Sequence, residues 1–568
     1  MVILDIEVFK HDIEVGVKKY GKNKYNYYWN KDALDILTYL HEEQIECINF
    51  NGEHYDLPLI FNWYFNKHNL ATPYEISKLI IVEHSTLKYP KGFFNSIDVM
   101  MNLQGWVGLK EIEAIIGWEI RESSINFDYE FKLTESQRRE VEYYNKQDLD
   151  ATEALYNKLK YHFTCRKQMC EFIGIDHDFS VPLPTLVGMG LGAHRNDNKG
   201  DFAISDKCLD IPIKHPIKQV MLEQMLKPQS DFSATFEIGG QSYKVGNGGI
   251  HSERKAWSGT DVYHVDVKGY YSLLMMIYNL FSRNLPQEGI DAYAKMYHTR
   301  LEYKKTNPAL ADSMKIGLLA IWGATRNYHH ILYDRYIGYL ITLYGQLFLI
   351  YLIELFADAG IEILNGNTDG LVVQGDINVI KKLNKEWEEY GGFDNEVIPY
   401  ARFVQKDVNN YIMGDSVDTL KAKGRDFKHL SKNWLFSNIV VVPQTPVTAR
   451  LLAKILYDEP DDPEGYVREH IKDYPLKDYI FIIKHTMKFD GMRYVETQTP
   501  IQKVNRCYAS LEGNHVEKFK GVNPYKYPNL PAVEMCNKDM NTYKKDDLKI
   551  DYDWYVDEIM KRYVVYYG

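Results

Sequence analysis

Ile363-Leu364-Asn365-Gly366-Asn367-Thr368-Asp369-Gly370-Leu371-Val372-Val373 places a polar turn between two short apolar runs. This pattern predicts a β-hairpin with Asp369 at its tip. A second β-rich run, residues 261–267, carries Asp266 near its end. Two aspartates held side by side on strands would form a site for hard divalent cations, which prefer oxygen ligands.

Length and composition predict several globular domains. The chain has 568 residues, of which 45% are hydrophobic, so each domain can bury its own core. Its six cysteines include no Cys-x-x-Cys pair, which disfavours structural zinc and a disulfide framework and fits a reducing compartment. We recognise no apolar run long enough to span a bilayer and no signal peptide, and therefore expect a cytoplasmic protein without a membrane.

The net charge of −11 argues against a basic coat over the whole surface. It does not exclude a basic channel, because a partner responds to the local potential. The richest basic stretch is residues 402–432, with Lys406, Lys421, Lys423 and Arg425 among its cations. Taken alone, this stretch fits a solvated loop better than a phosphate-binding segment.

Two acidic residues lie on one face of a predicted N-terminal strand. Residues 2–8 alternate in the way that suits a strand, which places Asp5 and Glu7 on the same face. Two acids on one face usually mark an exposed face. This pattern alone therefore indicates no function.

Two further polar patterns follow in the N-terminal third. A second strand is predicted for residues 47–50 and leads into Asn51-Gly52-Glu53-His54-Tyr55-Asp56. A helix is predicted for residues 141–155, and Tyr144 and Asp148 share one of its faces because they are four residues apart.

The order of these three patterns resembles the 3′–5′ proofreading exonuclease domain of DnaQ type. The resemblance implies that four carboxylates hold two Mg²⁺ or Mn²⁺ ions for two-metal hydrolysis: Asp5, Glu7, Asp56 and Asp148. It also implies that Tyr144 positions the attacking water and that Asn51 holds a single-stranded 3′ end. A plain α/β domain with surface acids is the alternative.

Asp266-Val267-Lys268-Gly269-Tyr270-Tyr271 resembles motif A of family B DNA polymerases. The resemblance implies that Asp266 binds both metal ions and that the carbonyl of Val267 is a further ligand. It also implies that Tyr271 is the steric gate. A ring beneath the sugar leaves no room for a 2′-hydroxyl, the group that distinguishes RNA from DNA, so the substrate would be a dNTP.

Residues 300–323 predict a short helical hairpin that turns at Asn307-Pro308. In the polymerase resemblance this hairpin corresponds to the fingers. Three of its cations would then face a triphosphate: Arg300, Lys304 and Lys315.

The second half of this hairpin resembles motif B, whose usual form is Lys-x-x-x-Asn-Ser-x-Tyr-Gly. Lys315 and Gly323 match, whereas Leu319, Ala320 and Trp322 replace the usual Asn, Ser and Tyr. The resemblance implies that Lys315 binds phosphate and stabilises the leaving group. The replacements put checking of the new base pair in doubt.

The hairpin around Asp369 then corresponds to motif C, usually Tyr-x-Asp-Thr-Asp-Ser. Asn367 replaces the first aspartate, so we expect a weaker or retuned second metal site. Residues 406–411 resemble the Lys-x-Tyr motif that grips the primer terminus, which assigns this role to Lys406 and Tyr411. Residues 246–251 resemble the glycine-rich linker that helps to bind the template.

The expected fold class is α/β and α+β multidomain, with an RNase H-like exonuclease domain and a right-hand polymerase of palm, fingers and thumb. The expected boundaries are 1–165 for the exonuclease, 166–245 for a connector, 246–430 for the palm with short fingers at about 280–325, and 431–568 for the thumb and C-terminal region. Gaps of 49 residues from Asp266 to Lys315 and 46 from Gly323 to Asp369 leave no room for the two insertions of protein-primed members.

The expected function is template-directed DNA polymerisation with 3′–5′ proofreading. Its partners would be primer-template DNA and dNTPs, with two Mg²⁺ or Mn²⁺ ions per active site. Compactness and resemblance suggest a phage enzyme that works with viral replication proteins in the host cytoplasm. One alternative is an exonuclease whose degenerate polymerase half is a DNA-binding platform, and another is a structural DNA-binding protein.

Overall fold

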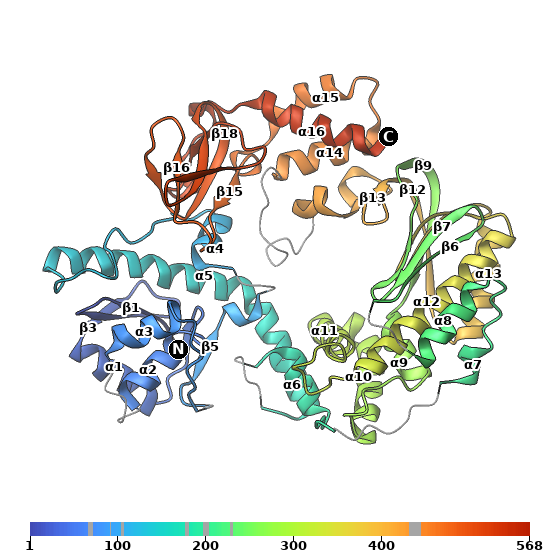
Figure 1. Cartoon of the computed structure of the whole chain (residues 1–568), viewed down its shortest axis with the longest axis horizontal. Coiled ribbons are helices and arrows are strands. Elements are labelled where there is room, and N and C mark those ends of the chain that lie inside the picture. Colours follow the sequence, from blue (N-terminus) through green and yellow to red (C-terminus); the bar gives the residue numbers. More distant parts are fainter. Residues whose placement is uncertain are drawn as a thin grey trace.

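The computed structural model describes residues 1–65, 72–90, 92–103, 107–176, 181–196, 204–227, 231–430 and 445–567. Parts of the predicted connector (177–180, 197–203, 228–230) and the start of the predicted thumb (431–444) lie outside these residues. The N-terminal, central and C-terminal parts of the chain follow one another around a ring (Figure 1). The chain is thus a mixed α/β protein of several domains.

A mixed sheet with helices on both faces forms the N-terminal domain. The strands are β1 (Val2–Val8), β2 (Ile13–Lys19), β3 (Tyr25–Trp29), β4 (Cys47–Asn49) and β5 (Ser96–Asp98). Their order is β3-β2-β1-β4-β5, with antiparallel pairing among β1, β2 and β3 and parallel pairing among β1, β4 and β5. The shorter helices are α1 (Lys31–Glu42), α2 (Asp56–Ile60), α3 (Pro73–Ile81) and α4 (Leu109–Ile116).

The alternation of β1 separates its apolar side chains from its acids. Leu4, Ile6 and Val8 belong to one apolar cluster, whereas Ile3 belongs to another that includes residues of α4 and of helix α5 (Glu135–Ile173). Because side chains alternate along a strand, Asp5 and Glu7 share the face of Ile3. The predicted strand and its acidic face are therefore confirmed, and that face lies against α5.

Helix α5 joins the N-terminal domain to the next part of the chain. It begins at a capping box of Thr134 and Gln137 and ends at Gly174, whose φ of 73° suits a left-handed C-cap. Beyond the N-terminal sheet it packs against α6 (Leu183–Gly190) and α11 (Pro308–Ala324). The helix predicted for 141–155 is thus much longer, and the predicted boundary at residue 165 falls inside it.

A large antiparallel sheet forms the central part, in the order β14-β13-β12-β9-β11-β10-β8-β7-β6. The strands are β6 (Ser233–Ile238), β7 (Gln241–Gly246), β8 (Gly249–Ser252), β9 (Trp257–Val267), β10 (Glu362–Asn367), β11 (Gly370–Gln374), β12 (Asn395–Asp407), β13 (Asn410–Gly414) and β14 (Lys421–Lys423). The predicted hairpin is β10 and β11, in which Asn367 pairs with Gly370. Strands β6 and β7 belong to this sheet although they precede or meet the predicted palm boundary at residue 246.

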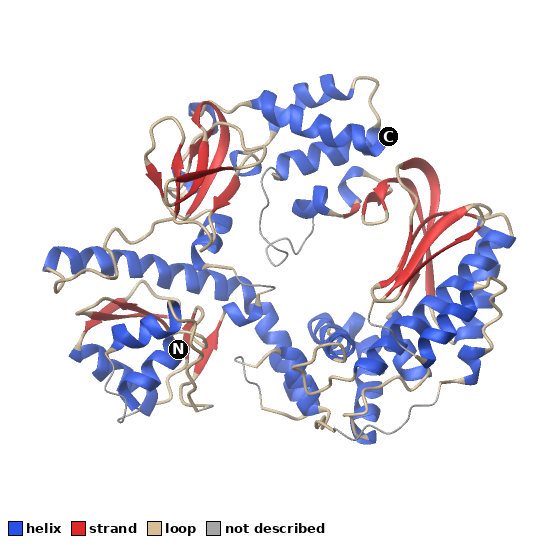
Figure 2. Ribbon diagram, in the orientation of Figure 1, coloured by secondary structure: helices blue, strands red, loops and turns tan. Residues whose placement is uncertain are grey.

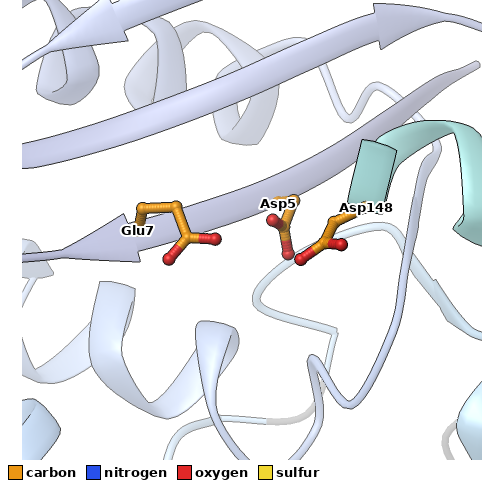
Figure 3. A group of neighbouring side chains, drawn as sticks. All are labelled: Asp5, Glu7 and Asp148. Carbon is orange, nitrogen blue, oxygen red and sulfur yellow. The ribbon is translucent and has the colours of Figure 1, made fainter. Parts of the chain in front are cut away.

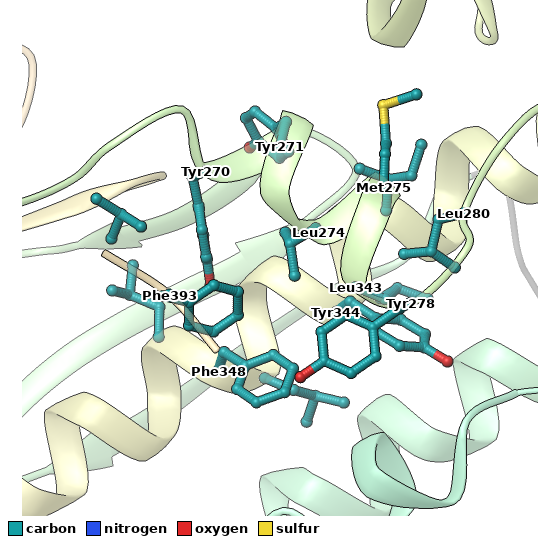
Figure 4. Packing of buried hydrophobic residues seen from close by; sticks show 14 of the residues in the cluster. Tyr270, Tyr271, Leu274, Met275, Tyr278, Leu280, Leu343, Tyr344, Phe348 and Phe393 are labelled. Carbon is teal, nitrogen blue, oxygen red and sulfur yellow. The ribbon is translucent and has the colours of Figure 1, made fainter. Parts of the chain in front are cut away.

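Helices cover one face of this sheet (Figure 2). They are α7 (Asp206–Leu209), α8 (Ile217–Leu226), α9 (Tyr270–Ile277), α12 (Arg335–Asp358) and α13 (Ile377–Gly391). Figure 4 shows part of this core, where Leu274 of α9, Tyr278 just after it, and residues of α12 such as Phe348 pack together. This burial of apolar surface is the main force that holds helices to a sheet.

One helix among the described residues, α12, is long and apolar enough to cross a membrane, with a mean hydropathy of 1.8 over its best window. Our expectation that no such run exists was therefore wrong. Of that window, 89% is buried inside the protein. A helix that is hydrophobic on all sides is typical of a large core. Helix α12 lies in such a core, beneath the sheet.

The predicted helical hairpin is confirmed as α10 (Gln287–Thr306) and α11, which pack against each other. Pro308 is the first residue of α11, where its missing N–H costs nothing. The side chain of Asn307 caps the helix by accepting a hydrogen bond from the backbone N–H of Leu310, at 3.3 Å. The turn residues recognised in the sequence therefore end one helix and start the next.

The C-terminal part combines a helical bundle with two small sheets. The helices are α14 (Pro446–Asp458), α15 (Pro463–His470) and α16 (Tyr552–Tyr567), and α16 packs against β9 and β12. One sheet contains β15 (Phe481–Lys484), β18 (Val504–Asn514) and β21 (Val533–Met535). The other contains β16 (Gly491–Tyr494), β17 (Pro500–Ile501), β19 (Val516–Lys520) and β20 (Asn523–Lys526).

The buried position of α12 predicts a large loss of stability from a cavity there. Leu347 is fully buried in the central core, so Leu347→Ala should lower the free energy of unfolding by about 2–5 kcal/mol. Lys381→Ala, at an exposed position of α13, is the control and should change it little. Urea unfolding of both variants tests this, and equal stability would contradict the assignment of α12 to the core.

Candidate metal centres

The first candidate metal centre lies between β1 and α5. Asp5 and Glu7 project from β1 and Asp148 from α5, with one carboxylate oxygen of each within 4.8 Å of the others (Figure 3). Glu7 and Asp148 are buried and Asp5 is partly buried. Three of the four predicted carboxylates are therefore brought together.

The electrostatics of this centre favour a bound cation. Burial, followed by the charge of Asp148, raises the pKa of Asp5 to about 7. Burial and the charge of Asp5 raise the pKa of Glu7 well above its ordinary value. Carboxylates that repel one another in a buried site are stabilised by a positive charge, and an oxygen-only donor set fits hard ions such as Mg²⁺ and Mn²⁺. The residues present therefore fit the expected metal.

Asp56, the fourth predicted ligand, lies near this centre but is not part of the group of three. It is buried at the first turn of α2. Burial raises its pKa, and the charges of Asp5 and Asp98 raise it further. Asp56 is thus within electrostatic reach of Asp5.

The loop that carries Asn51 is held by Asp98, a residue that our sequence reasoning missed. Asn51 has a φ of 64°, and its backbone N–H donates to the carboxylate of Asp98 over 2.9 Å. The backbone N–H of Glu53 donates to the other oxygen over 3.1 Å. Asp98 ends β5, and only the sheet order β1-β4-β5 places it beside this loop.

Lys110 is the main residue at this centre that sequence reasoning missed. It lies in the first turn of α4 and forms two ion pairs. One is with Asp148, and the other is with Glu113 at 3.0 Å. Its ammonium lies 4.4 Å from the ring centroid of Tyr144, which places Tyr144 at the centre as predicted. Burial lowers the pKa of Lys110, but the two carboxylates outweigh this and raise it overall.

Glu14 adds an unexpected buried carboxylate beside the centre. It lies on β2 directly opposite Glu7, so both side chains share a face. Neither of its carboxylate oxygens has a hydrogen-bond partner among the described residues. Burial, Asp5 and Glu142 raise its pKa well above the ordinary value.

The second candidate metal centre is formed by neighbouring strands of the large sheet. Gly370 of β11 pairs with Asp266 of β9, so Asp369 and Asp266 are adjacent. The backbone N–H of Val267 donates to the carbonyl of Asp369 over 3.3 Å. Burial and the charge of Asp266 raise the pKa of Asp369. Asp266 at the end of β9 and Asp369 in the β10–β11 turn are therefore neighbours, and their oxygen donors fit a hard divalent cation.

The turn that carries Asp369 rests on the glycine-rich turn between β7 and β8. Thr368 has a φ of 60°, and its backbone N–H donates to the carbonyl of Ile250 over 2.9 Å. Gly249 has a φ of 141°, and a Cβ there would lie 2.9 Å from Oγ1 of Thr368. Only glycine allows this approach without strain, so residues 246–251 support the turn that carries Asp369.

Asn367, which departs from the motif C pattern that this turn resembles, connects it to the turn between β12 and β13. Its amide nitrogen donates to the carbonyl of Val408 over 3.0 Å and to Oδ1 of Asn409 over 3.1 Å. An ionised carboxylate has no hydrogen to donate. The amide is therefore required by this local geometry.

Tyr271 stacks on Trp322 beside the second centre. Their ring centroids are 4.2 Å apart with an interplanar angle of 8°. Burial and the charge of Asp369 raise the pKa of Tyr271. The stack therefore brings α11 to the acidic pair, and it is formed by a residue that departs from the motif B pattern.

The predicted phosphate-binding cations lie on the helical hairpin. Lys315 and Trp322 are seven residues apart and share a face of α11, so Lys315 lies on the face that meets Tyr271. Lys304 and Lys315 are exposed and form no ion pair within the described part of the chain. Arg300 is partly buried and near Tyr297, whose pKa its charge lowers against the larger effect of burial.

Strands β12 to β14 bring aromatic and basic groups to the acidic pair. Burial and the charges of Asp369 and Asp266 raise the pKa of Tyr411 to about 12. Lys423, opposite Tyr411 in the sheet, lies 6.0 Å from its ring centroid. Burial lowers the pKa of Lys423, and Asp369 opposes this effect. Lys406 instead forms an ion pair with Asp426 at 3.6 Å.

A comparison of the chain with models of known protein families gives no match, and a search of curated proteins also gives none. Among solved structures, it is similar to the family B DNA polymerase from the hyperthermophilic archaeon Pyrobaculum calidifontis. The two chains share 15% sequence identity with a TM-score of 0.42, over 99% of this chain and 77% of that one. At these values the likeness carries no conclusion about this chain.

The buried carboxylate of Glu14 predicts a pH-dependent cost to stability. Folding raises the pKa of Glu14, so the folded state favours the protonated side chain. The stability gained from this protonation is complete below the unfolded pKa of about 4.3 and is lost as the pH rises. Glu14→Gln does not titrate, so its advantage over the wild type should grow from pH 4 to pH 7, to about 1–3 kcal/mol. Unfolding in EDTA at several pH values measures this difference.

The control for this prediction is Glu43→Gln, which alters an exposed glutamate after α1. It should change the unfolding free energy little at any pH. An advantage of Glu14→Gln that is constant or falls with pH would show that Glu14 is not a buried uncompensated carboxylate.

The hydrogen bonds of Asn367 predict that restoring the usual aspartate destabilises the protein. Asn367→Asp removes two donated hydrogen bonds and points a carboxylate at the carbonyl of Val408, which should cost about 1–3 kcal/mol at pH 7. Asn523→Asp, at an exposed position of β20, is the control. Unfolding is measured in EDTA so that bound cations do not mask the effect, and an equally stable Asn367→Asp variant would refute the role of the amide.

Proposed function

We propose that the chain is a template-directed DNA polymerase with a 3′–5′ proofreading exonuclease. The observation that carries this proposal is the register of β9 and β11, which places Asp266 beside Asp369 and next to the stack of Tyr271 on Trp322. A second, separate acidic centre at Asp5, Glu7 and Asp148 supports the exonuclease.

The arrangement of the elements supports the same proposal. The strand order β3-β2-β1-β4-β5, with helices on both faces, is that expected of an RNase H-like domain. The large antiparallel sheet, the α10 and α11 hairpin, and the C-terminal helices with their small sheets suit a palm, fingers and thumb. Replication of a phage genome in the host cytoplasm, with viral replication proteins, is part of the proposal.

Each acidic centre would hold two Mg²⁺ or Mn²⁺ ions. At the polymerase centre Asp266, Asp369 and the carbonyl of Val267 would be ligands, and at the exonuclease centre the four carboxylates predicted from the sequence. Bound ions of this kind supply charge neutralisation on phosphate oxygens and lower the pKa of the attacking hydroxyl or water.

The protein's own residues bind and orient the polymerase substrates. Tyr271, fixed by its stack on Trp322, would lie beneath the sugar of the incoming dNTP and exclude a 2′-hydroxyl. Lys315 would bind the triphosphate from the same face of α11, with Arg300 and Lys304 on α10. Such preorganised positive charge stabilises the leaving pyrophosphate without reorganisation.

The primer terminus would be held by the strands at the edge of the large sheet. Tyr411 lies within electrostatic reach of both aspartates and would pack against the terminal nucleotide. Lys423 adds a cation beside it, and Lys406 would contact the primer backbone. Holding the 3′-hydroxyl in line with the α-phosphate lowers the entropic cost of the reaction.

At the exonuclease centre, side chains from α4 and α5 would orient the reactants. Tyr144 would hold the attacking water, and its ring lies under the ammonium of Lys110. Lys110 forms an ion pair with Asp148 and would add positive charge beside the scissile phosphate. Asn51 would hold the single-stranded 3′ end from its loop next to Asp98.

An exonuclease with a degenerate polymerase half is the second candidate. Leu319, Ala320 and Asn367 depart from the family pattern, and the amide of Asn367 is engaged in local hydrogen bonds. The adjacency of Asp266 and Asp369 favours an active polymerase over a degenerate polymerase half that only binds DNA.

Primer extension separates the two candidates. Wild-type protein with dNTPs and Mg²⁺ should extend a labelled primer; Asp369→Ala should reduce extension by at least about a thousandfold while leaving degradation intact, because a required oxygen ligand is removed. Asp5→Ala should abolish degradation and leave extension intact. Degradation without any extension by the wild type, with Mg²⁺ or Mn²⁺, would establish the platform instead.

A further inference from the structure

Helix α4 contacts the first acidic centre at its first turn, and it contacts the C-terminal region from its first turn to its last. Lys110, in its first turn, forms the ion pair with Asp148. Glu111 accepts a hydrogen bond from Lys484 of β15 over 2.6 Å, and the carbonyl of Ala114 accepts one from Arg506 of β18 over 3.2 Å. Figure 1 shows α4 between α5 and these strands.

The segment after α4 is bound to the same part of the C-terminal region, residues 481–540, which we call the C-terminal β subdomain. The backbone N–H of Ile120 donates to the carbonyl of Asn537 over 2.7 Å, and that of Met540 donates to Gly117 over 2.9 Å. Ala114 and Ile120 also share an apolar cluster with residues of β15 and β18. The subdomain is therefore docked on α4 by backbone, side-chain and apolar contacts.

Arg506 lies at the centre of this contact between α4 and the C-terminal β subdomain. It is buried, with 1% of its surface exposed, and its guanidinium donates to the carbonyls of Cys536, Lys538 and Ala114. Ala114 lies in the last turns of α4, where the helix dipole favours a cation. Removing this buried cation leaves three carbonyls without their donor, so the contact between α4 and the C-terminal region is sensitive to substitution at Arg506.

The same C-terminal region also contacts the strands of the second centre. Glu459, at the end of α14, accepts a hydrogen bond from Ser258 of β9 over 2.9 Å and forms an ion pair with Arg402 of β12. Strand β9 carries Asp266. The C-terminal region thus touches elements of both acidic centres.

The contact between α4 and the C-terminal region borders a solvent-accessible pocket. A cavity of about 210 Å³ lies between α4 and the C-terminal region, lined by Ala114 and Ile115 on one side and by Arg450 and Ile480 on the other. The subdomain therefore contacts α4 through an apolar cluster and hydrogen bonds beside this pocket.

We propose that the C-terminal β subdomain positions Lys110 through α4, and so sets the rate of hydrolysis at the first acidic centre. Four residues of helix, about 6 Å, separate Lys110 from Ala114, and a helix of this length moves as a rigid unit. Loss of the hydrogen bonds from Arg506 to Ala114 and from Lys484 to Glu111 shifts Lys110 away from Asp148. Arg506 and Lys484 are positioning residues in this scheme, which rests on the proposed exonuclease.

The test measures degradation of a labelled single-stranded DNA oligonucleotide with Mg²⁺ under single-turnover conditions. Arg506→Gln should lower the rate about 10- to 100-fold, as expected for a displacement of roughly 1 Å. The matched control is Arg493→Gln, which alters an arginine of the same subdomain that pairs with Glu517 at 2.8 Å, and it should leave the rate unchanged. Equal rates for Arg506→Gln and wild type would overturn the proposal.

A double-mutant cycle shows whether Arg506 acts through Lys110. If it does, Arg506→Gln should cost little in a Lys110→Ala background, because coupled residues are not additive. Equal losses in both backgrounds would mean that Arg506 supports folding or DNA binding by another route, and would overturn the proposal.

A milder pair of variants guards against misfolding at the buried arginine. Lys484→Glu should slow degradation about two- to fivefold, the range expected for one partly exposed ion pair, and Lys484→Glu combined with Glu111→Lys should restore it. Absence of rescue would overturn the proposal. Failure of the wild type to degrade DNA would refute the proposed exonuclease itself, whereas wild-type degradation with unaffected variants would refute only the coupling.

Discussion

The pairing of β9 with β11 is the constraint on which the central part of the molecule depends. It opposes Gly370 to Asp266 and so brings two like-charged carboxylates together, an arrangement that costs free energy unless a cation is bound. The surrounding structure holds that arrangement in place. Gly249 admits the turn at Thr368, Asn367 fixes it to the turn between β12 and β13, and α12 supports the sheet from beneath.

Sequence spacing predicted the strand-borne acids well because strand periodicity and turn chemistry are local. Asp5 and Glu7 had to share a face of β1, and the hairpin at Asp369 followed from a polar turn between apolar runs. Partners brought in by distant elements could not be predicted in this way. Lys110, Glu14 and Asp98 reach the first centre only through the packing of α4, the register of β2 and the order of the sheet.

Departures from a family pattern had structural reasons that the sequence did not reveal. Trp322, which departs from the motif B pattern that its segment resembles, stacks on Tyr271. Asn367 replaces an aspartate of motif C, and its amide makes bonds that a carboxylate could not make. The helix α12 was predicted but its apolar character was underestimated, and its burial follows only from the sheet against which it packs. In each case the neighbour that explains the residue is remote in the sequence.

The central claim is that two separate acidic centres bind divalent cations and that the one at Asp266 and Asp369 assembles with primer-template DNA and dNTP. Crystals of the protein with primer-template, a non-hydrolysable dNTP analogue and Mn²⁺ test it most directly through anomalous scattering from manganese. We predict manganese between Asp266 and Asp369, next to the triphosphate, and manganese at Asp5, Glu7 and Asp148. Manganese at the first centre alone, with no nucleotide beside Asp369, would contradict the account.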